Sequence, residues 1–302
     1  MKLHRYTHHV SYAARALVVV GSAIAMIAAA GGVAVAGSPT LTTAESQAQT
    51  SMTAQSKTRT WHVQTGQQSR DLAIQGLAFL PQNIWIDAGE TITWTADSAE
   101  PHTVTFLAKG QQLPAFNPGD PTQLFQFPAA AAGTVPTYQP GSYFNSGVLG
   151  TIQDSFPVAA SYSLSFPTVG AFTYYCLVHG VVMKGTVHVA RTGTPYPFSQ
   201  REYDLYSSVA KSLILWDGYR LKAKTERQSS PNTVFQGADD GTAMVMRFIR
   251  QRVTVHVGDT VSFVNNGMAA PHTVTFGQEP ASPFTPVNLD TASHYAGGDL
   301  SS

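Results

Sequence analysis

With 302 residues, 43% of them hydrophobic and only 12% charged, the chain has enough apolar material for one or two folded domains, which excludes disorder throughout. Its 18 basic residues balance 18 acidic ones, so nothing in the charge favours nucleic-acid binding or an acidic tail for basic partners. The single cysteine, Cys176, cannot form a disulfide within the chain, so the fold must depend on its hydrophobic core.

The first 36 residues have the pattern of a signal peptide or membrane anchor. Lys2, Arg5 and Arg15 precede an apolar stretch, Ala16 to Ala36, that ends in the small residues a signal peptidase prefers. The stretch is also close to the ~20 residues that span a bilayer, so an uncleaved membrane tether is the alternative. Either interpretation places the rest of the chain outside the cytoplasm, as a periplasmic, cell-surface or secreted protein.

Residues 37–58 predict a flexible stalk, because they are rich in Ser, Thr, Ala and Gln and contain almost no large apolar residue. Short alternating runs of β-branched and aromatic residues then dominate residues 59–192. Such runs have the period of two of half-buried strands, and without a helical period between them they favour an all-β Greek-key β-sandwich. The clearest runs are 84–86, 91–95, 102–106, 161–166 and 186–189.

Two segments of the chain break this β pattern. Between Gly110 and Thr151 the sequence turns to Pro, Gly, Ala and Asn, which predicts a long surface loop. Residues 193–242 predict a linker with a helix, because Ser199 to Glu202 fits a capping box and apolar residues then recur at helical spacing until Gly218. Those apolar residues are Leu205, Val209, Leu213 and Trp216.

An internal repeat predicts a second module over residues 243–302. The segment from Phe79 to Phe106 recurs from Phe248 to Phe276, including the six-residue run Pro-His-Thr-Val-Thr-Phe. The offset is 169 between Gly89 and Gly258 (258 minus 89) and 170 between the two histidines (272 minus 102), so one insertion separates the copies. The second copy is truncated, since it has no counterpart of Cys176.

The predicted chemistry lies in the segment from Tyr174 to Gly185. It places a thiolate, an imidazole and a thioether on one loop between two strands, at Cys176, His179 and Met183. Two histidines and a cysteine with a long, weak axial methionine are the donors of electron-transfer copper sites. The second imidazole can come from His102 on the neighbouring strand. We therefore predict one type 1 copper ion with His102, Cys176, His179 and Met183 as its binding residues.

The other residues of this loop are apolar and are expected to exclude water from the metal. We also expect them to form a docking patch around an exposed edge of His179, through which an electron would pass. They are Leu177, Val178, Gly180, Val181 and Val182.

These motifs resemble the plastocyanin/azurin family of cupredoxins. The resemblance rests on Pro101–Phe106 and on Tyr174-Tyr175-Cys176 with two residues to His179 and three more to Met183, and it covers roughly residues 60–190 and, truncated, 243–302. It implies a β-sandwich, a blue copper ion with Met183 as axial ligand, and electron transfer between redox partner proteins. The chain departs from the family at Thr103, where members commonly carry an Asn whose amide helps to fix the cysteine loop, and in its longer stretch from His102 to Cys176.

Three classes of function make different demands on the sequence. A copper-delivery protein would be favoured by Met-rich or His-rich tracts, but the 7 Met are scattered. A fragment of a multi-cupredoxin enzyme would need further histidines for a catalytic copper, and the sequence has no His-x-His pair. An electron carrier that is not an enzyme and has no catalytic residues is therefore predicted. His272, which has a ligand-like context but no complementary loop, is interpreted as a structural relic.

Overall fold

The computed structural model describes residues 59–152, 157–267 and 272–276, all within one compact unit, Gln55–Ser302. The predicted signal or anchor (1–36), the stalk (37–58) and residues 277–302 of the predicted second module lie outside these ranges. Among the described helices, none combines the length and apolarity needed to cross a membrane.

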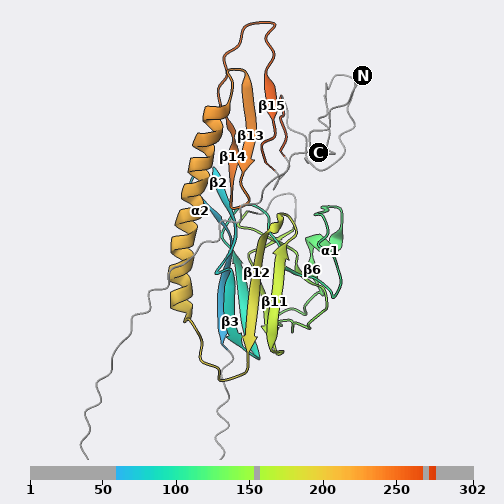
Figure 1. Ribbon diagram of the computed structural model, residues 1–302. Helices are drawn as coiled ribbons and strands as arrows, with labels where there is room; N and C mark the ends of the chain where they lie inside the picture. Colours follow the sequence, from blue (N-terminus) through green and yellow to red (C-terminus); the bar gives the residue numbers. More distant parts are fainter. Residues whose placement is uncertain (1–58, 153–156, 268–271, 277–302) are drawn as a thin grey trace, which may run out of the picture. The chain divides into compact units, whose positions relative to one another are not determined.

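The fold is mainly β, as predicted, with two large sheets and one long helix (Figure 1). The first sheet has the strand order β10-β4-β1-β2-β14-β13-β15, the second has the order β3-β12-β11-β5-β7-β6, and β8 pairs with β9. The elements of the first sheet are β1 (Thr60–Gln68), β2 (Ile74–Leu80), β4 (Glu90–Ala96), β10 (Ser161–Phe166), β13 (Thr233–Asp239), β14 (Ala243–Ile249) and β15 (Ser262–Val264). Those of the second are β3 (Asn83–Asp87), β5 (Thr105–Phe106), β6 (Gln126–Phe127), β7 (Phe144–Ser146), β11 (Gly170–Cys176) and β12 (Gly180–Ala190), with β8 (Val148–Leu149) and β9 (Val158–Ala159) apart.

The core lies between the two sheets because alternate residues of each strand point inward. Trp61 and Trp94 from the first sheet and Tyr174 from the second are fully buried in one hydrophobic cluster. The rings of Trp94 and Tyr174 meet edge to face with centroids 5.3 Å apart. Such pairs add roughly 0.5–1.5 kcal/mol beyond their buried area, so the sheets are held in a defined relation.

Four of the five predicted strand runs lie inside β3, β4, β10 and β12, but the run 102–106 contributes only β5. The reason is local. The amide of Thr103 donates to the sulfur of Cys176 and that of Val104 donates to the hydroxyl of Ser146, so neither is available for a regular ladder. The amides of Thr103 and Val104 therefore bond to side chains in place of a neighbouring strand.

The segment expected to be a long loop holds several short elements, including helix α1 (Pro121–Leu124), which is capped by the side chain of Asp120. The side-chain amide of Asn145 in β7 donates to the carbonyl oxygens of Thr122 and Gln123, which ties the excursion to the second sheet. Elements of two to four residues are too short to show a period, so the sequence pattern did not predict them.

Helix α2 (Gln200–Gln228) starts at the predicted capping box. Ser199 accepts from the amide of Glu202, and the Glu202 carboxylate accepts from the amide of Ser199. The predicted end at Gly218 is wrong. Gly218 is buried where α2 crosses the sheet, and a Cβ there would lie 2.1 Å from Cγ2 of Ile74, so this glycine permits close packing and does not end the helix.

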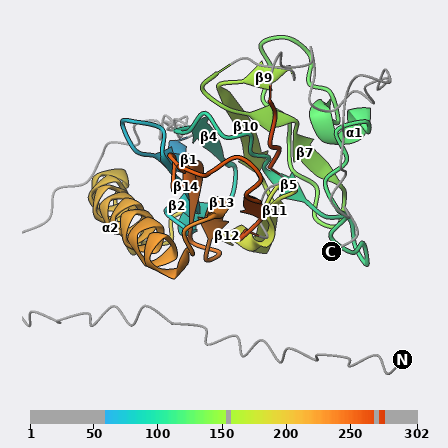
Figure 2. The ribbon, with the colours of Figure 1, turned by 90° about the horizontal axis from the view of Figure 1, so that it is seen from above.

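The face of α2 that packs on the sheet carries Tyr203, Ser207, Gly218 and Thr225, and it lies over one side of the first sheet (Figure 2). The apolar residues that identified the helix in the sequence, Leu205, Val209, Leu213 and Trp216, are exposed. Small residues on the contact face let the helix backbone approach the strands closely. The apolar residues that predicted the helix lie on the other, exposed face.

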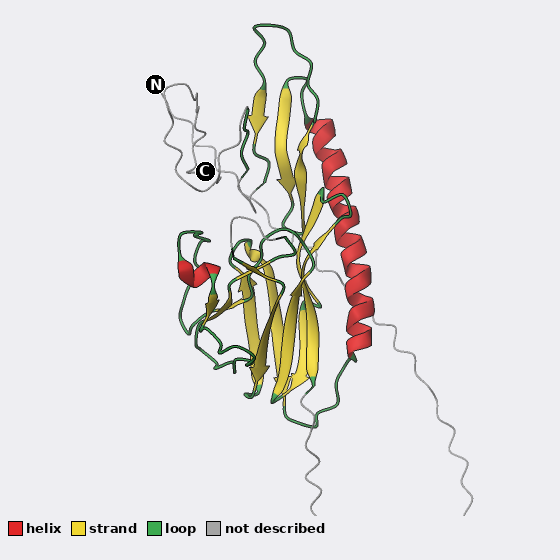
Figure 3. Ribbon diagram, turned by 180° about the vertical axis from the view of Figure 1, so that it is seen from behind, coloured by secondary structure: helices red, strands yellow, loops and turns green. Residues whose placement is uncertain are grey.

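Strand β13 lies within the segment predicted as linker, and β14 continues the first sheet from β2. Ile74 pairs with Val245, Gln75 with Met244 and Gly76 with Ala243 in an antiparallel ladder. Helix α2 contacts β2, β13 and β14 along this seam, as seen from behind (Figure 3). The parts of the chain on either side of α2 therefore share one sheet.

Candidate metal centre

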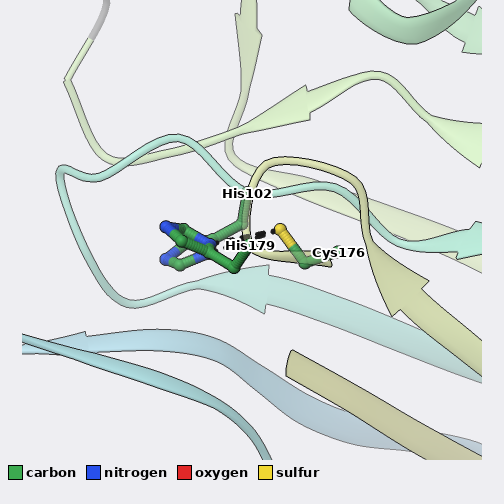
Figure 4. A group of neighbouring side chains, drawn as sticks. All are labelled: His102, Cys176 and His179. Atoms are coloured by element: carbon green, nitrogen blue, oxygen red, sulfur yellow. Dashed lines mark hydrogen bonds between the residues drawn. The ribbon is translucent and has the colours of Figure 1, made fainter. Parts of the chain in front are cut away.

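Three predicted ligands converge at one end of the sandwich, where their side chains point toward one another (Figure 4). Sγ of Cys176 lies 3.8 Å from Nδ1 of His102 and 3.4 Å from Nδ1 of His179. All three residues are buried, and their ligand atoms lie within 4.8 Å of one another. No other group of three or more His, Cys, Asp or Glu side chains in the described residues has such a geometry.

Met183 on β12 is fully buried in the same hydrophobic cluster as Cys176. The ladder between β11 and β12 contains a bulge between Tyr175 and Cys176, after which Cys176 pairs with Gly180. Gly180 has φ of +60°, a conformation that costs glycine little. This pairing closes a tight loop that brings His179 back beside the sulfur. The four residues together are consistent with a type 1 copper site.

The ring of His102 is held by a glycine and a serine. Gly66, at a bulge in β1 with φ of +70°, leaves the space in which the ring lies, because a Cβ there would be 2.2 Å from Nε2 of His102. Oγ of Ser98 lies 2.9 Å from the same nitrogen and donates its own proton to the carbonyl oxygen of Glu100. With its hydroxyl proton directed to Glu100, Ser98 is placed to accept a hydrogen bond from Nε2–H of His102, and in that tautomer the Nδ1 lone pair faces Cys176.

The cysteine loop is held by a directed chain of hydrogen bonds. The amide of Leu177 donates to Oγ1 of Thr103, whose hydroxyl lies 2.9 Å from that of Thr105. Thr105 in turn donates to Oδ1 of Asn145. The amide of Thr103 also donates to Sγ of Cys176 at 3.4 Å. Thr103 thus performs the loop-fixing role that the family resemblance assigns to an asparagine.

Burial lowers the pKa of His102 well below its usual range, and His179 lowers it further, so this ring is neutral. Burial alone would raise the pKa of the Cys176 thiol. The attraction of His179, with hydrogen bonds from His179 and the Thr103 amide, outweighs burial and lowers this pKa. Burial would lower the pKa of His179, but the Cys176 thiolate and then Glu100 raise it to about 9.

The two shifts reinforce each other, because a thiolate at Cys176 favours the protonated form of His179 and a protonated His179 favours the thiolate. With its pKa at about 9, His179 holds a proton at neutral pH that a metal binding to Nδ1 must displace, whereas His102 is already neutral. Two neutral imidazole nitrogens, a thiolate and a thioether fit copper, since soft sulfur donors with imidazole select that metal.

The predicted exposed edge of His179 is wrong, because this residue is only 5% exposed. Nε2 of His179 has no hydrogen-bond partner among the described residues, and Oε1 of Glu100 lies 3.7 Å away, at ion-pair distance. Of the loop residues expected to surround that edge, Leu177 is buried, whereas Val181 and Val182 are 69% and 40% exposed. Exposed apolar side chains thus follow His179 in the sequence, but the imidazole itself is buried.

Several residues that support the site were not predicted from the sequence. They are Gly66, Ser98, Glu100, Thr105 and Asn145. None lies in a motif with metal-ligand spacing, and only folding brings them to the site. His272, interpreted as a relic, lies outside the metal-ligand group and beside Gly237, where a Cβ would be 3.1 Å from its Nε2.

One family model covers the part of the chain that holds this site. Residues 66–190 match the family model described as copper binding proteins, plastocyanin/azurin family. The match includes His102, Cys176, His179 and Met183, so the motif resemblance is confirmed for this domain, and it does not extend to residues 243–302. A plastocyanin from Scenedesmus fuscus is 29% identical over 114 residues, which cover 37% of this chain and 87% of that protein.

Among solved structures, an oxidised methionine-to-lysine variant of amicyanin aligns with 18% identity over 43% of this chain and 82% of its own, with a TM-score of 0.26. The Cu(I) form of a methionine-to-alanine variant of amicyanin aligns with 19% identity over the same shares and the same TM-score.

Proposed function

We propose that this chain is an exported blue copper protein that binds one type 1 copper ion and transfers single electrons between redox partner proteins. The observation that carries the proposal is the convergence of Cys176 Sγ with the Nδ1 atoms of His102 and His179 in a buried group. Met183, in the same buried cluster, would be the axial ligand. Bound copper would supply the one-electron redox chemistry.

The protein's own residues would keep the site rigid. Ser98 and Gly66 hold the ring of His102, and Thr103 holds both the sulfur of Cys176 and the loop that follows it. A rigid donor set that changes little between oxidation states lowers the cost of gaining or losing an electron. The buried surroundings also exclude water, which affects the reduction potential.

Burial of the ligands favours a carrier over the two alternatives. Delivery of copper to an acceptor requires ligand exchange, and His102 and Cys176 are fully buried while His179 is 5% exposed. A catalytic copper needs a coordination position open to substrate, and four protein donors around one metal would leave none. Slow removal of bound copper by an external chelator would support the carrier. Rapid transfer to an acceptor without electron exchange would support delivery.

The direct test is spectroscopy of the copper-loaded protein. We expect an intense visible thiolate-to-copper band and a paramagnetic resonance spectrum with the narrow copper hyperfine splitting of type 1 sites. The Cys176→Ala variant should lose the band. The Met183→Leu variant, which conserves volume, should keep the band and change the reduction potential. A colourless wild-type protein with copper bound would contradict the proposal.

Export and domain division complete the proposal. The N-terminal pattern of basic residues, apolar stretch and small residues supports export to the periplasm, cell surface or medium, with a membrane tether if the signal is retained. Residues 59–192 would be the copper domain. Sequencing the N-terminus of protein recovered from outside the cytoplasm would separate a cleaved signal from an anchor, and recovery only from the cytoplasm would contradict export.

A further inference from the structure

Helix α2 carries an apolar stripe that takes no part in its packing on the sheet. The contact face includes the buried Gly218, whereas four large residues on the opposite side are between 45% and 62% exposed. They are Tyr206, Val209, Leu213 and Trp216. In Figure 1 and Figure 2 no other helix or strand of the described residues lies beyond this side of α2. A contiguous row of exposed apolar side chains of this size indicates an interaction surface.

The exposed residues follow the spacing of a coiled-coil seam. From Glu202 to Arg220 the steps along this side of α2 are four, three, four, three and four residues, which is the alternation of a and d positions in a heptad. We call these six residues the outer stripe: Glu202, Tyr206, Val209, Leu213, Trp216 and Arg220. At 1.5 Å per residue the outer stripe is about 27 Å long. A heptad seam on one helix is the surface on which a second helix packs.

The outer stripe is complementary to itself when its direction is reversed. Its members form three pairs, at two, five and nine residues on either side of position 211: Val209 with Leu213, Tyr206 with Trp216, and Glu202 with Arg220. Two identical helices that pack antiparallel about this position would therefore place the members of each pair opposite each other. Both copies would use the same surface, which is the isologous contact of a closed two-fold dimer.

The charges at the two ends of the outer stripe select the antiparallel direction. Parallel pairing of two copies would set Glu202 against Glu202 and Arg220 against Arg220, whereas antiparallel pairing sets glutamate against arginine at both ends. The guanidinium of Arg220 already lies on this side of the helix, 4.7 Å from the ring centroid of Trp216. The bonds from Ser199 to Glu202 go to Oε2, so Oε1 can accept from an arginine. Exposed ion pairs contribute only about 0.2–1 kcal/mol, so they set the direction while the apolar residues supply the affinity.

We propose that the outer stripe of α2 binds the same stripe of a second copy of this chain, as an antiparallel helix pair with two-fold symmetry. The argument for this occupant is the reversed match of both size and charge: valine meets leucine, tyrosine meets tryptophan, and glutamate meets arginine. The outer stripe contains none of the residues that form or support the metal centre. The dimer therefore does not depend on the proposed function, and its absence would leave that function untouched.

Sedimentation equilibrium of the full, metal-free chain under reducing conditions measures the assembly. We expect the mean mass to rise towards twice the monomer mass with increasing concentration. Val209→Lys places an unpaired charge in the seam and should raise the dissociation constant at least about tenfold. Ser208→Lys adds the same charge at an exposed position about 100° away around the helix and should change the constant less than about twofold. Both positions are exposed, so both variants should keep the melting temperature of the monomer.

Disulfide trapping tests the direction of the pair. A mixture of Tyr206→Cys and Trp216→Cys chains, oxidised with glutathione disulfide and without copper, should form a cross-linked dimer that contains one chain of each kind. Neither variant alone should cross-link, because positions 206 and 216 lie about 15 Å apart along the helix and only antiparallel copies bring them together. The native Cys176 is buried and should not react.

Other outcomes would overturn the proposal. A chain that stays monomeric at every concentration has no such dimer, and association that Val209→Lys leaves unchanged must use another surface. Cross-linking of Trp216→Cys with itself would show a parallel pair. A monomer that sediments with vesicles of anionic lipid, and no longer does so as Val209→Lys, would show that the outer stripe binds a membrane surface and not a second copy.

Discussion

The amide of Leu177 donates a hydrogen bond of 2.8 Å to the hydroxyl oxygen of Thr103, so the residue after the cysteine is tied to the residue after the first ligand histidine. The series of hydrogen bonds continues from Thr103 through Thr105 to Asn145, whose side-chain amide also holds the loop segment around α1. The metal loop and the longest insertion of the domain are therefore mechanically connected.

Replacing Thr103 with alanine would leave the buried amide of Leu177 without an acceptor. We expect Thr103→Ala to lower the free energy of unfolding by about 1–3 kcal/mol, the cost of an unsatisfied buried polar group, and to speed copper loss. Thr103→Ser keeps the hydroxyl and should retain most of the stability. Urea unfolding of the metal-free variants measures the difference. Equal stability of the alanine and serine variants would show that the hydroxyl does not hold the loop.

Gly66→Ala and Gly89→Ala form a matched pair. Both glycines have positive φ, so each substitution should cost about 1–2 kcal/mol through the backbone. A Cβ at Gly66 would also collide with His102 and Ser98, whereas a Cβ at Gly89 meets nothing within 4 Å. We expect copper affinity to fall by about 10- to 100-fold in Gly66→Ala only. Copper titration against a competing chelator checks this. An equal loss of affinity in both variants would show that the space left by Gly66 is not needed for the ring of His102.

Glu100→Gln should raise the reduction potential. Oε1 of Glu100 lies 3.7 Å from the outer nitrogen of His179, where a carboxylate stabilises Cu(II) more than Cu(I). We expect a change on the order of tens of millivolts, measured by redox titration of the blue band. Glu226→Gln removes the same charge from the exposed end of α2 and should change the potential much less. Equal changes would mean that only net charge matters.

Gly218→Ala should destabilise the protein, although the same change in an exposed helix interior stabilises by about 1 kcal/mol. The added methyl would lie 2.1 Å from Cγ2 of Ile74, so α2 must move away from the sheet. We expect the free energy of unfolding to fall by about 1–3 kcal/mol. Ser212→Ala, at an exposed position of the same helix, is the control and should be neutral or slightly stabilising. A higher melting temperature for Gly218→Ala would contradict the close packing.

The metal-free protein should lose stability as the pH falls below 6.5. Burial lowers the pKa of His102 well below 6.5, so in this range the unfolded chain takes up a proton that the folded protein does not. This contribution is fully present above pH 6.5 and is lost by at most about 1.4 kcal/mol for each pH unit below it. His179 acts in the opposite sense at higher pH, because its pKa is raised to about 9 and its stabilising contribution grows as the pH falls from 9 to 6.5. Well below pH 6.5 it is protonated in both states and adds little dependence.

Urea unfolding at pH 6.0 and 5.0, where His179 contributes little to the pH dependence, would measure this loss, and His102→Gln should reduce it. An unchanged loss in that variant would assign the acid sensitivity to other groups.

The sequence by itself determined the metal-site motif, the β class and the start of α2. Cys176, His179 and Met183 are close along one loop, and strand alternation and the capping box are also local patterns, so each is readable from neighbouring residues. His102, which lies far from this loop in the sequence, was predictable because its motif Pro-His-Thr-Val-Thr-Phe is repeated. Local spacing and residue type carry this information without knowledge of the fold.

Only the tertiary structure decided which residues support the ligands and which faces are covered. Gly66, Ser98 and Asn145 act through contacts across 36, 4 and 40 residues, the separations from their partners His102, His102 and Thr105, and none of these pairs shares a metal-ligand motif. Gly218 is read locally as a helix end, yet it serves a helix–sheet contact. Packing also buried the edge of His179 that the loop sequence suggested would be exposed, because burial depends on segments that meet only after folding.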